Sequence, residues 1–222
     1  VNANTSLMER RRELTDLFTR VGRIQFLVLA LIASGIVFFG KYFIVRIWAG
    51  KGYDDSYVVA LLLILTVTIE LIQNLGIEIQ RAEIKHQFRS ITYFFMAILN
   101  LIISVILCQR YGAIGSAIGT AISFVVANGI IMNIYYHKQC NIDMIYFWSK
   151  IGKLSLGLII PVILGIVFTY FLPAKSLIVY IIEITVYVLI YAFSMWKIGM
   201  NEYEKNLFRS IMLKIFCLGR NK

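Results

Sequence analysis

The sequence is poor in charged residues, in proline and in cysteine. Charged residues make up 15% of the 222 and apolar residues 59%, with 2 prolines and 3 cysteines. A soluble domain has about 25% charged and about 45–50% apolar residues. The composition therefore excludes an ordinary water-soluble globular domain.

The cysteines and histidines lack the spacing of a metal or redox site. Cys108, Cys140 and Cys217 lie far apart without a CxxC pair, and His86 and His137 stand alone in loops. Zinc sites and disulfide frameworks need clustered ligands or pairs. The sequence also has no GxxxxGK[ST] phosphate loop and no GxSxG elbow. We therefore expect no cofactor.

The apolar residues are concentrated in six blocks of roughly twenty residues, the length that crosses a hydrocarbon core of about 30 Å. The sequence therefore predicts an all-α polytopic membrane helix bundle with about six transmembrane helices. The predicted spans are 24–45, 56–79, 91–108, 113–135, 151–172 and 177–195.

These spans divide the chain into three parts. Residues 1–23 are predicted to be a cytoplasmic amphipathic linker, 24–199 a six-helix transmembrane lobe, and 200–222 a basic cytoplasmic tail. The chain begins with Val1, and its first twenty-odd residues are too polar for a signal peptide. We expect it to be a fragment without its N-terminal portion.

Basic residues flank the spans unequally. Of the 22 Lys and Arg residues, seventeen lie on the side of the two termini and five on the opposite side. Cytoplasmic loops carry the excess of Lys and Arg, so both termini are predicted to be cytoplasmic. Because the basic residues lie beside hydrophobic spans, we expect the lipid bilayer and no nucleic acid as their partner.

Polar residues follow the second predicted span at helical spacing. In a continuous helix they project within about 100–130° of one another. Such a stripe should face protein or a water-filled cavity rather than lipid. It is interpreted as the wall of a transport pathway, or else as a polar seam between helices. The residues are Thr66, Glu70, Gln73, Asn74, Arg81 and Lys85.

Two further spans carry patterns that favour packing. Gly115 and Gly119 place small residues at a four-residue interval in the fourth span, which lets helices approach closely in lipid. The sixth span has a polar and aromatic face that we interpret as a packing seam. Its members are Tyr180, Glu183, Tyr187, Tyr191 and Ser194.

Residues 15–150 contain a series of segments in a consistent order. They are FGKYFIVRIWAGKGYDDSY at 39–57, the QN pair at 73–74, AEIKHQFRS at 82–90, the asparagine at 100 and YGAIGSAIGTAIS at 111–123. Lys85, His86 and Arg89 together with the GxxGxAxGT run at 112–120 form the most specific combination. With these segments the chain resembles the C-terminal half of bacterial polysaccharide flippases, the Wzx-type O-antigen and capsule exporters of the multidrug/oligosaccharidyl-lipid/polysaccharide superfamily.

The resemblance implies one lobe of a two-lobe exporter in the bacterial cytoplasmic membrane. Residues 5–23 would link it to a missing N-terminal lobe, and rocking of the two lobes would move the cargo. The cargo would be an undecaprenyl-pyrophosphate-linked oligosaccharide. Lys41, Glu70, Gln73 and Asn74 would line the cavity.

A basic cytoplasmic mouth would attract the pyrophosphate in this scheme. Arg81, Lys85 and Arg89 would form it, with Arg20 and Arg23 as weaker candidates. Glu70, taken as a lone carboxylate, does not by itself establish ion coupling.

Other functions remain open. A cation-coupled multidrug antiporter of the same superfamily would carry cationic cargo, whereas the net basic loop at 81–89 favours an anion. The predicted non-cytoplasmic loops, of about ten, four and four residues, are too short for a catalytic constellation, so we expect no enzyme. A non-transporting membrane assembly subunit is a further alternative.

Overall fold

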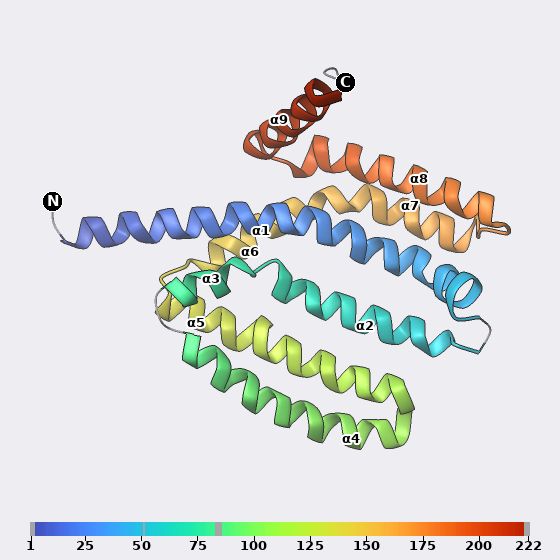
Figure 1. Ribbon diagram of the computed structural model, residues 1–222, viewed down its shortest axis with the longest axis horizontal. Helices are drawn as coiled ribbons and strands as arrows, with labels where there is room; N and C mark the ends of the chain where they lie inside the picture. Colours follow the sequence, from blue (N-terminus) through green and yellow to red (C-terminus); the bar gives the residue numbers. More distant parts are fainter. Residues whose placement is uncertain (1–2, 51, 83–85, 220–222) are drawn as a thin grey trace. The chain divides into compact units, whose positions relative to one another are not determined.

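The computed structural model describes residues 3–50, 52–82 and 86–219, and over these ranges all regular structure is helical (Figure 1). The all-α prediction is confirmed for this part of the chain. The chain forms two compact units, Val1–Ile151 and Gly152–Lys222.

The first unit consists of long helices joined by short ones, with α6 continuing into the second unit. Helix α1 packs against α2, and α2 packs against α4. The helices are α1 (Ala3–Tyr42), α2 (Asp54–Leu71), α3 (Leu75–Ala82), α4 (His86–Phe124), α5 (Met132–Gln139) and α6 (Met144–Ser155). Two π-helical segments extend α1 and α4, namely η1 (Phe43–Trp48) and η2 (Val125–Ile131).

Helix α1 runs without interruption through the predicted boundary between linker and lobe at residues 23 and 24. Its 40 residues span about 60 Å at 1.5 Å per residue, twice the thickness of the hydrocarbon core. One half of α1 is therefore long enough to cross the membrane by itself.

The second predicted span is broken, so the continuous helix assumed for its polar stripe is wrong. Helix α2 ends at Leu71, and α3 begins at Leu75 in a direction bent by 42°. Turn hydrogen bonds bridge the break, from Gln73 N to Glu70 O and from Gly76 N to Gln73 O. Asn and Gly are poor helix formers, and Gly76 packs against Tyr136. The predicted polar stripe therefore does not continue along one helical face beyond the end of α2.

Helix α4 folds back on itself at Gly112 (Figure 1). Gly112 has φ 57° and ψ −136°, a conformation that only glycine adopts readily. A Cβ atom at Gly119 would lie 2.4 Å from Ser104 Oγ, and one at Gly115 would lie 2.2 Å from the Leu107 carbonyl oxygen. The predicted close approach of helices at these glycines is confirmed.

A buried apolar cluster lies where α1, α3, α5 and α6 meet. The Phe18 ring contacts Phe147 edge-on at 4.8 Å between centroids, and Tyr136 at 5.9 Å. Outside this core, long apolar side chains such as Phe94 and Leu101 on α4 are mostly exposed, as expected for surfaces that face lipid. The core residues are Phe18, Ile72, Ile79, Met132, Tyr136, Cys140, Ile142, Met144, Phe147 and Ile151.

In the second unit, a hydroxyl compensates for the hydrogen bond that Pro161 cannot donate. Proline has no N–H, so the carbonyl four residues earlier loses its helical partner. That carbonyl belongs to Gly157, and Ser194 Oγ donates to it at 2.7 Å. The elements are η3 (Leu156–Leu158), α7 (Ile159–Tyr170), α8 (Leu177–Ser194), η4 (Met195–Gly199) and α9 (Glu202–Gly219).

The aromatic face predicted in the sixth span is confirmed as a buried face of α8. Tyr180, Glu183, Tyr187, Tyr191 and Ser194 are its buried residues. The predicted basic tail is largely helical, since α9 covers most of it. Helix α9 begins at a reciprocal cap in which the backbone N–H groups of Asn201 and Glu204 bond each other's side chains.

Four helices of the described chain are long and apolar enough to cross a membrane, or five if the bent pair α2 and α3 counts as one span. The chain is thus helical and multi-pass, but the predicted number of about six spans is not confirmed by this count. The difference from six arises at two places. The bent pair α2 and α3 is not counted among the four, and 87–139 counts as one helix although it turns back at Gly112.

We predict that Gly76→Ala destabilises the protein by about 1–3 kcal/mol, the usual cost of overpacking. An added Cβ atom would lie 2.4 Å from Tyr136 Cζ. Gly35→Ala is the matched control, because nothing lies within 4 Å of its added Cβ. Thermal unfolding of purified variants in detergent, followed by size-exclusion chromatography, measures the difference. Equal melting temperatures for the two variants would contradict the prediction.

Candidate functional site

The buried Arg89 side chain is the centre of a polar cluster in the first unit. From the start of α4 it donates through Nη2 to Glu70 Oε1 at the end of α2, at 2.9 Å. Through Nη1 it donates to the Tyr136 hydroxyl on α5, also at 2.9 Å. Only 10% of the Arg89 side chain and 24% of the Glu70 side chain are exposed. This is an ion pair largely removed from solvent.

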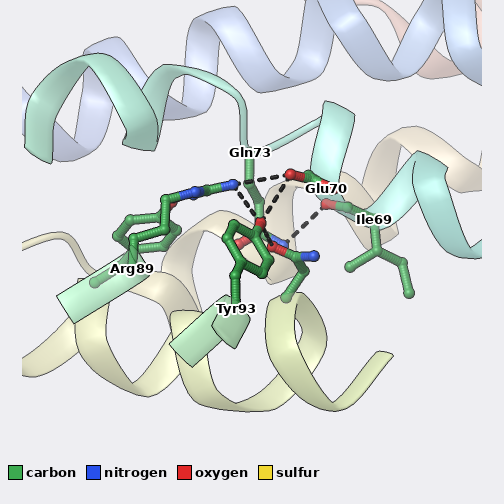
Figure 2. A network of polar contacts seen from close by, with 7 residues as sticks. Ile69, Glu70, Gln73, Arg89 and Tyr93 are labelled. Carbon is green, nitrogen blue, oxygen red and sulfur yellow. Dashed lines mark hydrogen bonds and ion pairs between the residues drawn. The ribbon is translucent and has the colours of Figure 1, made fainter. Parts of the chain in front are cut away.

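Tyr93 lies one helical turn beyond Arg89 and extends the cluster (Figure 2). Its hydroxyl accepts from Arg89 Nη2 and lies 2.8 Å from Glu70 Oε1 and 2.7 Å from Asn128 Oδ1. A phenol has one hydrogen to donate. It can therefore serve Glu70 or Asn128, but not both at once.

Local backbone features place these side chains. Arg89 and Tyr93 are four residues apart, so they share one face of α4, and the Arg89 guanidinium also lies over the Tyr93 ring at 4.8 Å. Asn128 belongs to the π-helical segment η2, an irregularity that often accompanies functional sites. Glu70 lies in the last turn of α2, directly before the break.

The structure shows that Glu70 is paired, which the sequence alone did not indicate. Arg89 and Tyr93 both contact its Oε1 atom, and the ion pair has no net charge. A buried charge is stable only when it is paired and hydrogen-bonded. Removing either partner would leave the other as an uncompensated charge.

Several buried amide atoms near the helix break have no hydrogen-bond partner within the described part of the chain. Gln73 Nε2 donates to Ile69 O at 3.1 Å, but its Oε1 is unpaired, as is Asn128 Nδ2. Gln80 on α3 is fully buried and both of its amide atoms are unpaired. Buried polar atoms usually have partners, so this region is suited to bind water or a polar ligand.

The other predicted site residues lie outside the cluster. Lys41 is exposed at the end of α1, next to Gly40, which approaches Tyr57 near the start of α2. Glu70 is about 20 Å further along α2 at 1.5 Å per residue. Asn74 is exposed in the turn at the helix break. Of the predicted pathway residues, Glu70, Gln73 and Arg89 come together.

The basic residues predicted for the cytoplasmic mouth occupy different environments. Arg81 is exposed and forms an ion pair with Glu78 at 2.9 Å, whereas Arg89 is buried. Lys85 lies outside the described residues. Of the two weaker candidates, Arg20 is exposed and Arg23 is buried, with its Nη1 donating to the Lys150 carbonyl oxygen at 2.9 Å.

The sequence analysis missed Tyr93, Tyr136 and Asn128. Tyr136 lies beyond the end of the fourth predicted span, and tyrosines near span ends are common at membrane interfaces. Asn128 could have been found, because it is one of two amides inside a mainly apolar span. Tyr93 could have been found only by assuming that Arg89 points into the protein, since it lies one turn further along that face.

No family model matches the sequence, and no curated protein or solved structure matches it significantly. The resemblance to polysaccharide flippases therefore stays a prediction. No group of three or more His, Cys, Asp and Glu side chains in the described ranges could hold a metal ion.

We predict that Arg89→Ala destabilises the protein by about 3–5 kcal/mol, the usual cost of breaking a buried ion pair. The substitution leaves Glu70 without its cation and Tyr136 without its donor. Arg81→Ala is the matched control, since an exposed pair contributes about 0–1 kcal/mol. Melting temperatures in detergent provide the measurement. If both variants melt alike, Arg89 does not hold the helices together.

Proposed function

We propose that the chain is part of a transporter that flips lipid-linked oligosaccharide repeat units across the cytoplasmic membrane for surface polysaccharide biosynthesis. In this proposal it forms one lobe of a two-lobe exporter, and a second lobe completes the pathway. The cargo is an undecaprenyl-pyrophosphate-linked oligosaccharide, with an anionic pyrophosphate, polar sugars and an apolar tail.

The observation that supports the proposal most strongly is the polar cluster at the break between α2 and α3. Broken helices with charged and amide side chains at the break are typical of transporter binding sites. Here Glu70, Arg89 and Tyr93 lie beside the buried amides of Gln73 and Asn128. Ionisable groups inside membrane helices are costly and usually serve transport.

The charge of the cluster favours this function over a cation-coupled multidrug antiporter. A cationic drug or a coupling ion would bind an available carboxylate, but Glu70 is already paired with Arg89. An anionic cargo requires an accessible cation instead. Arg81 meets this requirement, because 66% of its side chain is exposed and its partner Glu78 is 60% exposed, so pyrophosphate can compete with Glu78 for the guanidinium.

We predict that Glu70→Gln and Arg81→Ala each reduce polysaccharide export about tenfold or more in the full-length protein, as expected for losing a charge-assisted hydrogen bond. Surface polysaccharide is measured in cells without their own flippase, with protein abundance in the membrane quantified in parallel. Glu78→Gln and Arg110→Ala are the controls. Glu78→Gln frees Arg81, and Arg110 is an exposed arginine close to the turn at Gly112.

Three outcomes are decisive. Full export by both variants at normal abundance removes Glu70 and Arg81 from the pathway. Drug resistance without glycan export favours the antiporter. The third outcome combines two results. If vesicles without the protein still flip lipid-linked oligosaccharide normally, while cells without it assemble polysaccharide defectively, the protein has a role in assembly instead.

A further inference from the structure

A second feature of the first unit, separate from the Arg89 cluster, is an open groove between α5 and α6. It encloses about 480 Å³ and its wall is mainly apolar. Ile134 of α5 and Ile145 of α6 line it and are mostly exposed, at 51% and 75%. Its base includes the buried Met144. The groove is accessible from outside the protein and offers apolar contacts along its length.

One wall of the groove is fixed by hydrogen bonds. Trp148 lines it and donates from its indole N–H to Asn133 Oδ1 at 2.6 Å. Asn133 Nδ2 in turn donates to the carbonyl oxygens of Asn128 and Gly129 in η2, at 2.6 and 3.1 Å. The π-helical geometry of η2 thus provides the acceptors that orient the indole ring.

The groove has a basic end. Lys138 and His137 lie at the C-terminal end of α5, beside the loop at 140–143, and both line the groove. Lys138 is exposed and forms no ion pair with any described residue. The nearby acid Asp143 lies 4.0 Å from His137 Nδ1 and accepts the backbone N–H groups of Ile145 and Tyr146. Lys138 is therefore available for an external anion.

We propose that this groove binds an anionic glycerophospholipid of the surrounding bilayer. An acyl chain would lie along Ile134, Ile145 and Trp148, and the phosphate would contact Lys138 and His137. Trp and Lys side chains are typical of the membrane interface, where a lysine contacts headgroups while an indole lies at the edge of the acyl region. This proposal does not rest on the proposed transport function, because any multi-pass protein meets the same lipids.

The occupant is assigned from charge and shape. An apolar groove alone would accept any acyl chain, whereas a cation at one end selects an anionic headgroup. Gly129 lies at the other end. Apart from its chain neighbours and its own helix backbone, the described residues place one atom within 4 Å of an added Cβ there, a Val125 methyl carbon at 3.6 Å. This free space leaves room for a chain to pass between η2 and Trp148.

The experiment uses Trp148 as the reporter. The chain has 3 tryptophans, so Trp48→Phe and Trp196→Phe leave Trp148 alone in it. The protein is placed in nanodiscs that contain either dibrominated phosphatidylglycerol or dibrominated phosphatidylcholine, because bromine quenches a tryptophan in contact with it. We expect phosphatidylglycerol to bind about fivefold better than phosphatidylcholine, the usual contribution of one lysine near an anionic surface.

Two pairs of variants test the two ends of the groove. Lys138→Gln should abolish the preference for phosphatidylglycerol, whereas Lys153→Gln, an exposed lysine on α6, should retain it. Gly129→Leu should reduce quenching by both lipids because it fills the space beside Trp148. Gly152→Leu, at a glycine with nothing within 4 Å of its added Cβ, should not.

Three results would overturn the proposal. Equal quenching by the two lipids shows that the headgroup is not selected. An equal loss of preference in Lys153→Gln and Lys138→Gln shows general surface electrostatics rather than a site. Stronger relief of quenching by unbrominated undecaprenyl phosphate than by unbrominated phosphatidylglycerol assigns the groove to a polyprenyl lipid instead.

Discussion

The guanidinium of Arg89 joins three segments that are distant in the sequence. It bonds the end of α2 through Glu70 and the middle of α5 through Tyr136, while its own helix α4 carries Tyr93 into the same cluster. Apolar helices in lipid gain little from the hydrophobic effect on contacting one another, so polar contacts and close packing determine their association. The arrangement of the first unit around its core therefore depends on this cation, because Tyr136 belongs to both the cluster and the core.

A second constraint is that backbone polar groups in an apolar region need partners inside the protein. Ser194 bonds the carbonyl that Pro161 leaves free, and Asn133 bonds two carbonyls of the π-helical segment η2. At these two irregularities a side chain provides the hydrogen-bond partner that the backbone lacks. At η2 the same asparagine also accepts the Trp148 indole N–H, so the side chain that satisfies the backbone carbonyls also positions one wall of the groove.

Much of the architecture could be predicted from the sequence. Blocks of apolar residues indicated the helices, and the interval between Gly115 and Gly119 indicated the close approach that the structure shows. The break at 72–74 was not predicted, because hydropathy is the same for a straight and for a bent helix. The site was predicted only in part. Glu70, Gln73 and Arg89 were selected as polar residues near one span, but their pairing was not predicted.

The sequence by itself determined that the chain forms membrane-spanning helices. A block of about twenty apolar residues partitions into the bilayer, and there a helix satisfies its backbone N–H and C=O groups within the same segment. Only the tertiary structure decided that Arg89 is buried against Glu70 while Arg81 remains exposed beside Glu78. The two arginines have the same chemistry and lie eight positions apart, so no local property distinguishes them. The physical reason is the packing of α4 against α2, which places Arg89 beside Glu70 and Tyr136, whereas Arg81 lies on an exposed part of α3.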